Sequence, residues 1–457
     1  MPPILEKFRF RHRAQHRPPV RGGNKDWKPK AGRPLRRDWV FWGSVLLVIA
    51  GVLGLYFWTT TARILQDPLR LDYGPTDPKF ASALGPMVGA EFTAGNSVET
   101  LVNGVRFFPS MLEAIREAKS TVTLETYIWS PGDISDQFID ALGAAAQRGV
   151  QVLVLVDGMG TLKFRGEDRE RLEKSGVKVV KYGREHWWEV KPNINHRTHR
   201  KLLIVDGKVG FTGGMCIDDR WLGDADAEDR WRETVVRVEG PVVRQMQAVF
   251  AANWLRTTSS LILGEGYFPT SRPAGEVVSH CFMSGPSEGP QHARLAHLFA
   301  IAGARKTIDI GHAYFVPDDL AIDMLLEARQ RGVRVRVIVP ATSDSAFGRA
   351  ASRSRWARLL EGGVEFNLYH GSLYHCKSMV VDATLVTLGS ANFDNRSFAI
   401  NDEVSINLLD PKVGAEHVRL FEEDLKRTVP LTAQEFAARP FHIKAADWFC
   451  GLFRSQF

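Results

Sequence analysis

The two halves of the chain each contain one copy of the same polar pattern, and this pattern carries side chains that are well suited to catalysis. Residues 199–206 read HRKLLIVD and residues 375–382 read HCKSMVVD, so both fit HxKxxxxD. The repeated residues are His199, Lys201 and Asp206 in the first copy and His375, Lys377 and Asp382 in the second. In a β-strand, side chains two residues apart point to the same side. Each histidine is therefore predicted to face one site together with its lysine.

Two imidazoles and two ammonium groups in one place indicate an anionic, phosphate-like ligand. One imidazole can attack as a nucleophile while the other protonates the leaving oxygen. The lysines would stabilise charge on the transferring phosphoryl group in place of a metal. A single histidine is more simply a hydrogen-bonded core residue, but a duplicated His–Lys pair argues against that interpretation. The sequence contains no metal-binding pattern such as HExxH, so we expect neither a metal nor a cofactor.

The segments around the two motifs alternate between strand and helix patterns. A strand, a helix and a buried strand are predicted at residues 121–129, 135–149 and 150–157. The first and third patterns return at residues 307–316 and 327–341. The sequence therefore predicts an α/β fold of two duplicated units, each a sheet flanked by helices, with the active site between them.

The sequence resembles the phospholipase D superfamily, whose members carry two HxKxxxxD motifs in a duplicated fold. Within this superfamily it looks most like the bacterial cardiolipin synthases. The resemblance covers roughly residues 95–430 and includes LETYIW, FTGGMCIDDRW, VEGP, YFVPDD and GSANFDNRSF. It implies two phospholipase D-like domains and transfer of a phosphatidyl group through a phosphohistidine.

The resemblance also implies roles for individual residues. His199 would be the nucleophile and His375 the general acid and later the base, although the opposite assignment stays open. Lys201 and Lys377 would hold the phosphate, with Asn392 as a further donor. A downstream carboxylate orients each histidine in the family, and Glu233 and Glu403 occupy the corresponding positions. For Glu233, the alternative is a solvated carboxylate near Arg232. Asp206 and Asp382 would hold backbone or lysine contacts without touching the substrate.

The first half departs from the family pattern at one position. Relatives often place an asparagine at the end of the glycine-rich turn, where this chain has Cys216. A thiol is a poor replacement for an amide donor, which puts a symmetric phosphate cradle in doubt. Cys216 as a second nucleophile is an alternative, but a small buried filler is the preferred interpretation. The chain's four cysteines are far apart, which excludes a disulfide scaffold or a zinc ribbon.

The net charge of +7 comes from the beginning of the chain. Residues 1–38 hold 12 Lys or Arg against 3 Asp or Glu, so the rest of the chain is slightly acidic. This distribution disfavours a nucleic-acid-binding body. Residues 39–58 are free of charge, long enough to cross a bilayer, and flanked by aromatic residues. They predict a single transmembrane helix.

The side of the membrane follows from the Lys and Arg residues near this helix. Seven precede it between Arg21 and Arg37, and three follow it within residues 59–80. The arm should therefore stay cytoplasmic and the catalytic body lie on the non-cytoplasmic side of a bacterial inner membrane. Many relatives have two spans and a cytoplasmic body, so the family analogy favours the opposite placement.

The sequence thus predicts seven consecutive regions. They are a basic cytoplasmic arm (1–38), a transmembrane helix (39–58), a linker (59–95), a first phospholipase D-like domain (96–263), a linker (264–290), a second phospholipase D-like domain (291–430) and an amphipathic tail (431–457). In the tail, Phe441, Trp448 and Phe449 belong to an apolar stripe, and Thr432 with Glu435 forms a candidate capping box. The stripe predicts an interfacial helix, with docking onto the domain as the alternative. His186, Trp187 and Trp188 could line the approach to the first motif or simply pack.

These expectations give one leading function and two alternatives. The leading function is a membrane-anchored phosphatidyltransferase that makes cardiolipin from phospholipids, with phosphatidylglycerol as the expected substrate. The first alternative is a phospholipase D or a nuclease-type hydrolase, and the second is a non-catalytic membrane scaffold. The predicted partners are membrane phospholipids and the bilayer, without nucleic acid. The sequence does not determine the oligomeric state.

Overall fold

The computed structural model describes residues 36–59, 65–183, 195–287, 289, 291–453 and 456. The chain divides into two units, Met1–Ile64 and Leu65–Phe457. Most of the basic arm and the segment His186, Trp187 and Trp188 lie outside the described residues.

The first unit contributes one helix, α1 (Arg36–Thr59), which includes the predicted span. Its side chains are described for residues 39–51, and most of them are exposed, including Trp39, Trp42 and Leu47. None of the helices in the described part of the chain reaches the length and hydropathy of a membrane-crossing segment. The side chains of residues 52–58 lie outside that part, so the transmembrane helix stays a prediction.

The second unit is built from the same succession of elements twice. The first half contains β1 (Thr93–Val102), α3 (Gly104–Glu117), β2 (Thr121–Thr126), α4 (Asp133–Gln147), β3 (Gln151–Asp157), α5 (Gly166–Lys174), β4 (Lys178–Tyr182), β5 (Leu202–Val205), β6 (Val209–Gly213), the 3₁₀ helix η1 (Asp219–Trp221), β7 (Thr234–Glu239) and α6 (Val243–Thr258). The second half contains β8 (Val277–Ser284), α7 (His292–Gly303), β9 (Thr307–His312), α8 (Asp319–Gln330), β10 (Arg334–Pro340), α9 (Ala346–Arg353), α10 (Ala357–Glu361), β11 (Glu365–Tyr369), β12 (Lys377–Val381), β13 (Leu385–Gly389), α11 (Asn395–Ala399), β14 (Glu403–Leu409) and α12 (Pro411–Leu425).

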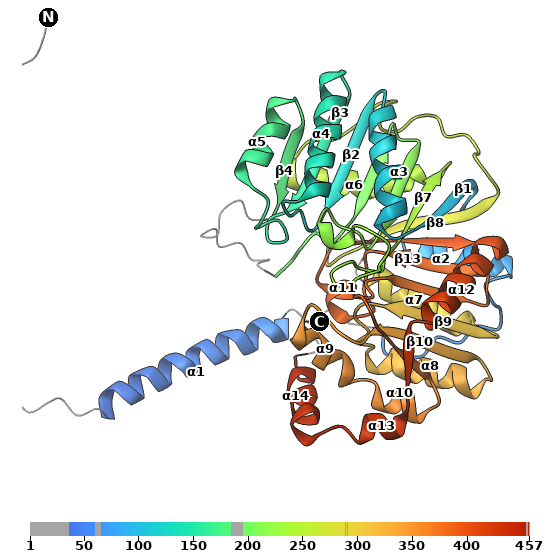
Figure 1. Ribbon diagram of the computed structural model, residues 1–457. Helices are drawn as coiled ribbons and strands as arrows, with labels where there is room; N and C mark the ends of the chain where they lie inside the picture. Colours follow the sequence, from blue (N-terminus) through green and yellow to red (C-terminus); the bar gives the residue numbers. More distant parts are fainter. Residues whose placement is uncertain are drawn as a thin grey trace, which may run out of the picture. The chain divides into compact units, whose positions relative to one another are not determined.

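The strands form one mixed sheet in the order β15-β11-β10-β9-β12-β13-β14-β8-β1-β7-β6-β5-β2-β3-β4, where β15 is Thr428–Leu431. From the central pair β8 and β1, the order of strands outward is the same in both halves. In each half three strands run parallel and the rest are antiparallel. Figure 1 shows the first half in cyan and green and the second in yellow to red. The duplication predicted from the sequence is therefore the symmetry of the sheet.

Three cores hold the layers together. Helices α3 and α4 bury Phe108 and Phe138 against the first half-sheet, and α7 and α8 cover the second half in the same way. The third core combines residues of both halves, including Ile204 of β5, Val386 of β13 and Trp254 of α6. Because apolar burial is the main stabilising force, this shared core fixes one half against the other. The two halves therefore form one body.

Two predicted linkers contain regular structure. Strand β8 lies within residues 264–290 and pairs with β1, so this stretch joins the halves instead of only connecting them. Helix α2 (Pro78–Met87) lies within residues 59–95 and buries Phe80 and Leu84 in the core of the second half. Sequence analysis missed both because glycine and proline residues around them interrupt the periodic patterns.

The C-terminal region follows the second half as two helices, α13 (Ala433–Ala437) and α14 (Phe441–Gly451). The predicted capping box is present, since Thr432 and Glu435 bond reciprocally, but it starts the short α13 rather than the helix with the apolar stripe.

Candidate active site

The first motif places its histidine just before strand β5. The His199 backbone N–H donates to the Asp402 carbonyl oxygen over 2.8 Å, so this segment is paired to the second half. Its Nδ1 lies 2.9 Å from both carboxylate oxygens of Glu403. The Lys201 ammonium donates to the His199 carbonyl oxygen over 2.6 Å, which holds the lysine beside the histidine.

The second motif repeats this geometry just before β12. The His375 backbone N–H donates to the Arg232 carbonyl oxygen over 2.9 Å. Its Nδ1 lies 2.7 Å from Oε2 of Glu233. The Lys377 ammonium donates to the His375 carbonyl oxygen over 2.6 Å and lies 3.3 Å from Nε2 of the imidazole.

The two carboxylates pair with the histidines across the halves. Glu233 belongs to the first half and contacts His375, whereas Glu403 belongs to the second half and contacts His199. Both glutamates are fully buried, which overturns the alternative that Glu233 is solvated. In both couples Nδ1 lies against a carboxylate, so a substrate would meet Nε2, which in His375 also lies 3.3 Å from the Lys377 ammonium. The sequence predicted the four residues but not this crossing.

The environments of the two glutamates differ. Glu403 accepts from the Ser390 hydroxyl at 2.5 Å and from Asn401 at 3.4 Å. Burial raises the pKa of Glu403, but His199, Lys201 and Ser390 more than offset it, so the net pKa lies below the usual value. Gly214 stands in the place of Ser390, and a Cβ there would meet Oε2 of Glu233 at 2.2 Å. Glu233 accepts instead from the Thr234 backbone N–H over 2.9 Å, and burial raises its pKa.

The two histidines and the two lysines of the motifs lie close together in the site. Burial lowers the pKa of His199 to about 4 and that of Lys201 to about 8. Burial, followed by the nearby Lys377 charge, lowers the pKa of His375 well below its usual value. Lys201 and Lys377 each lower the pKa of both histidines, which requires the four groups to lie close together. The free site therefore holds neutral imidazoles between ammonium groups, an environment that attracts an anion.

Aromatic rings support both imidazoles. The Tyr127 ring packs edge-on against His199 with centroids 4.9 Å apart, and the Lys201 ammonium lies 5.3 Å from the same ring. Trp221 and Trp231 both lie with ring centroids 5.1 Å from His375. These rings limit the rotation of the imidazoles and keep water from their faces.

The aspartates of the motifs lie at the far ends of their strands and bind backbone. Asp206 accepts from the N–H groups of Lys119, Ser120 and Thr121. Asp382 accepts from the corresponding groups of Arg305, Lys306 and Thr307. As expected from the sequence, both hold backbone contacts; these contacts fix the turn before β2 and the turn before β9.

Asn392 and Cys216 occupy equivalent positions in the two halves. Asn392 is buried, and its Oδ1 has no hydrogen-bond partner within the described part of the chain. A buried carbonyl oxygen without a donor is costly, and a ligand group that donates a hydrogen bond could complete it. Cys216 is 2% exposed and belongs to the apolar core of the first half, as the filler interpretation predicted.

A buried network behind His199 escaped the sequence analysis. Asp402 accepts from the Tyr182 hydroxyl at 2.6 Å, and Nε2 of His196 lies 2.9 Å from its other oxygen. Behind Thr198, Glu125 lies 2.5 Å from the threonine hydroxyl, and burial raises its pKa to about 7. One signal in the sequence could have indicated these residues. Asp402 directly precedes Glu403, and Thr198 directly precedes His199.

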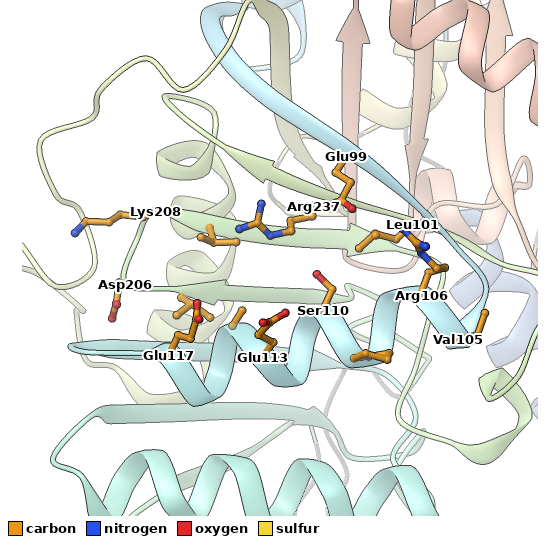
Figure 2. Close-up of a pocket in the computed structure, with 14 residues that line it drawn as sticks. Glu99, Leu101, Val105, Arg106, Ser110, Glu113, Glu117, Asp206, Lys208 and Arg237 are labelled. Carbon is orange, nitrogen blue, oxygen red and sulfur yellow. The ribbon is translucent and has the colours of Figure 1, made fainter.

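The described residues of this site form no candidate metal cluster, and the groove lined by α3 does not include its histidines or lysines. Within the described residues, no group of three His, Cys, Asp or Glu side chains could hold a metal ion. The groove in Figure 2 is lined by α3 and the neighbouring strands, with Ser110, Glu113, Asp206 and Arg237 around it. It includes the aspartate of the first motif but none of the histidines or lysines.

A duplicated mixed sheet whose halves each bring one His–Lys pair to a shared site defines a phospholipase D-like protein. Residues 111–254 and 298–425 match the family described as "Cardiolipin synthase, PLD-like domain". The fold is similar to that of the phosphatidylserine synthase of Haemophilus influenzae, with a TM-score of 0.61 at 15% identity over 83% of this chain and 100% of that one.

Two proteins similar in sequence belong to a narrower class, the cardiolipin synthases. The chain is 31% identical over 364 residues to cardiolipin synthase 1 of Bacillus cereus, covering 78% of this chain and 72% of that protein. It is 32% identical over 360 residues to the major cardiolipin synthase ClsA of Bacillus subtilis, covering 78% and 75%. The chain therefore belongs to the phospholipase D superfamily and is a cardiolipin synthase-like enzyme.

Proposed function

We propose that the enzyme is a phosphatidyltransferase that makes cardiolipin from two phospholipid molecules, with phosphatidylglycerol as donor and acceptor. The observation that carries this proposal is the pair of crossed His–Glu couples, each with Nδ1 against a carboxylate and a lysine beside the imidazole. Two such couples supply the nucleophile and the acid that a two-step phosphodiester exchange requires.

In the first step, Nε2 of His199 attacks the phosphorus of the donor lipid. Binding of the phosphate anion favours the protonated form of His375. The bond between phosphorus and the headgroup glycerol oxygen breaks, and Nε2 of protonated His375 gives its proton to that oxygen as glycerol leaves. In the second step, a hydroxyl of a second phosphatidylglycerol gives its proton to His375 and attacks the phosphorus. The P–N bond then breaks and frees His199.

The difference between the two glutamates supports this assignment of roles. A phosphohistidine carries positive charge on its ring, and Glu403, whose pKa is lowered, is the carboxylate better suited to stabilise that charge. Lys201, Lys377 and the Asn392 amide would hold the phosphate oxygens in both steps. Neutral His199 is the form able to attack, and its lowered pKa keeps it neutral near pH 7.

Incubation of the purified full-length enzyme with phosphatidylglycerol vesicles tests the proposal. We expect cardiolipin and free glycerol in equal amounts, resolved by lipid chromatography and a glycerol assay. Phosphatidic acid as the main product would instead show that water resolves the intermediate, and the enzyme would be a hydrolase. No conversion of any phospholipid would favour the non-catalytic scaffold.

We further propose that residues 39–58 anchor the enzyme in a bacterial inner membrane, with the catalytic body on the non-cytoplasmic side. The support is the excess of Lys and Arg before this segment. A C-terminal reporter that is active only in the cytoplasm should then be silent. An active reporter would contradict this topology.

A further inference from the structure

Helix α14 attaches to the second half through the side that carries Asp447 and Cys450. Asp447 is 3% exposed and accepts from Arg353 over 2.7 Å and from Arg439 over 2.5 Å. On the same side, Cys450 packs against Ala350 and Ala351 of α9. An amphipathic helix on a soluble protein ordinarily buries its apolar face, so this helix lies the opposite way round.

The apolar side of α14 consequently faces outward. Phe441 is 85% exposed, Trp448 67%, Phe449 53% and Leu452 55%. We call these four residues the outer face. A contiguous apolar patch of large side chains on a protein surface marks an interaction site. Tryptophan and phenylalanine at such a position are typical of helices that lie in the interface of a lipid bilayer.

The surface beside the outer face is cationic. A hollow of about 260 Å³ next to Trp448 and Leu452 is lined by Arg353, Arg355, Arg439 and Lys444, with Asp447 as its acidic member. Arg355 is also paired with Asp319, so four cations stand against two carboxylates, and the positive charge exceeds the negative charge at the edge of the apolar patch. This combination is complementary to anionic phospholipids, whose headgroups meet basic residues while aromatic residues enter the acyl region.

Gln456, which follows α14 in the chain, contacts a segment close to the first motif. The side-chain oxygen of Gln456 accepts from the Asn195 amide over 3.1 Å. Arg396 donates to the Asn195 carbonyl oxygen over 3.0 Å and to that of Gln456 over 3.4 Å. Asn195 lies four residues before His199, and Arg396 is close enough to Glu403 and Tyr127 for their charges to affect its pKa. Gln456 therefore lies beside the segment that precedes His199.

We propose that the outer face of α14 docks on the surface of an anionic phospholipid bilayer and brings the mouth of the active site to it. This inference deepens the proposed function, because it names the surface that meets the source of the substrate. The docking is independent of residues 39–58 and uses no residue of the two His–Glu couples.

A label on the outer face tests the docking directly. The four native cysteines are buried, so Trp448→Cys in the full-length chain can carry a single polarity-sensitive fluorophore. Leu263→Cys, at a 72% exposed position on the loop after α6, is the matched control. In phosphatidylglycerol vesicles, the label at position 448 should shift to the blue and be quenched by acyl-chain spin labels, and phosphatidylcholine vesicles should give a weaker response. The control should give neither signal.

Two results would overturn the docking. The first is emission at position 448 that matches the control in both kinds of vesicle. The second is shielding of the label that rises with protein concentration and ignores the lipid quencher, which would make a second copy of the chain the occupant. Both readouts are independent of turnover, so they decide the docking even if the transferase activity is absent.

A kinetic comparison tests the effect of this docking on turnover. Trp448→Ser with Phe449→Ser should lower turnover of phosphatidylglycerol vesicles by about tenfold or more, because two aromatic contacts with the bilayer are lost. Turnover of dihexanoyl phosphatidylglycerol below its micelle concentration should not change. Leu261→Ser with Leu263→Ser should affect neither substrate. Equal losses on both substrates, or no loss on vesicles, would contradict the inference.

Discussion

The imidazole of His375 and the carboxylate of Glu233 lie 2.7 Å apart although they belong to opposite halves of the sheet. Glu403 and His199 form the reciprocal couple. The histidine of each half is therefore oriented by the glutamate of the other half. A displacement of one half against the other would disturb both couples together.

The crossed couples predict that each glutamate affects the histidine of the other half. Glu403→Gln should change the ¹⁵N shift of His199 Nδ1 and leave that of His375 in place, and Glu233→Gln should do the reverse. Both variants should lose about 10²- to 10⁴-fold in turnover, because the imidazole loses the acceptor that supports its charged form. A shift confined to the histidine of the same half would contradict the pairing.

Replacement of either histidine should abolish turnover without unfolding the enzyme. In the proposed mechanism the two imidazoles have separate tasks, so neither can substitute for the other. His199→Asn and His375→Asn should keep the circular dichroism spectrum and melting temperature of the unmodified enzyme. Near-normal activity in either variant would exclude the two-histidine mechanism.

Asp206→Asn should reduce stability rather than catalysis. The carboxylate accepts three backbone N–H groups, and an amide presents a donor to some of them, so we expect a loss of about 1–3 kcal/mol in the free energy of unfolding. Turnover per folded molecule should stay the same. Lys208→Ala, at the exposed position two residues on, is the control and should change neither quantity.

The pH profile of kcat/KM should have limbs set by His199 and Lys201. Their pKa values of about 4 and about 8 leave the histidine neutral and the lysine charged between these limits. Turnover should therefore fall below about pH 4, where His199 takes up a proton, and above about pH 8, where Lys201 loses one. Glu403 raises the pKa of His199, so the acid limb of Glu403→Gln should move to lower pH. Movement to higher pH would contradict this electrostatic account.

Chelation should leave turnover unchanged. The ammonium groups of Lys201 and Lys377 supply the positive charge that a metal would otherwise bring to the phosphoryl oxygens. The measurement is cardiolipin formation before and after dialysis against EDTA, with a magnesium-dependent phosphatase as the control. Loss of activity that a divalent cation restores would contradict this prediction.

The repeated motifs predicted the duplicated sheet and the residues that meet in the site, because strand alternation and sequence repetition are local properties. The partner of each histidine could not be predicted in this way. Whether Glu233 faces His199 or His375 depends on how two half-sheets pack through their shared core, and no local pattern carries that information. The role of strand β8 in joining the halves could not be predicted locally either, since it depends on pairing with β1 far away in the chain.

The orientation of helix α14 could not be predicted from the sequence either. The spacing of Phe441, Trp448 and Phe449 predicted an amphipathic helix, and the helix is present. The orientation of the helix depends on Asp447. This carboxylate accepts a hydrogen bond from Arg353 of α9, so the apolar side of α14 faces outward. The helix docks on the domain, as the alternative interpretation proposed, and its apolar face stays exposed, so the interfacial helix stays a prediction.

The crossed couples also bear on how such a chain could have originated. One half, standing alone, contains a histidine and a glutamate that cannot reach each other within that half. It would complete both couples only by associating with an identical copy around a twofold axis, with β1 of one copy beside β1 of the other. The junction of β1 and β8 in the present chain has that arrangement, which makes a symmetric dimer of half-length subunits the simplest ancestor able to carry out the reaction.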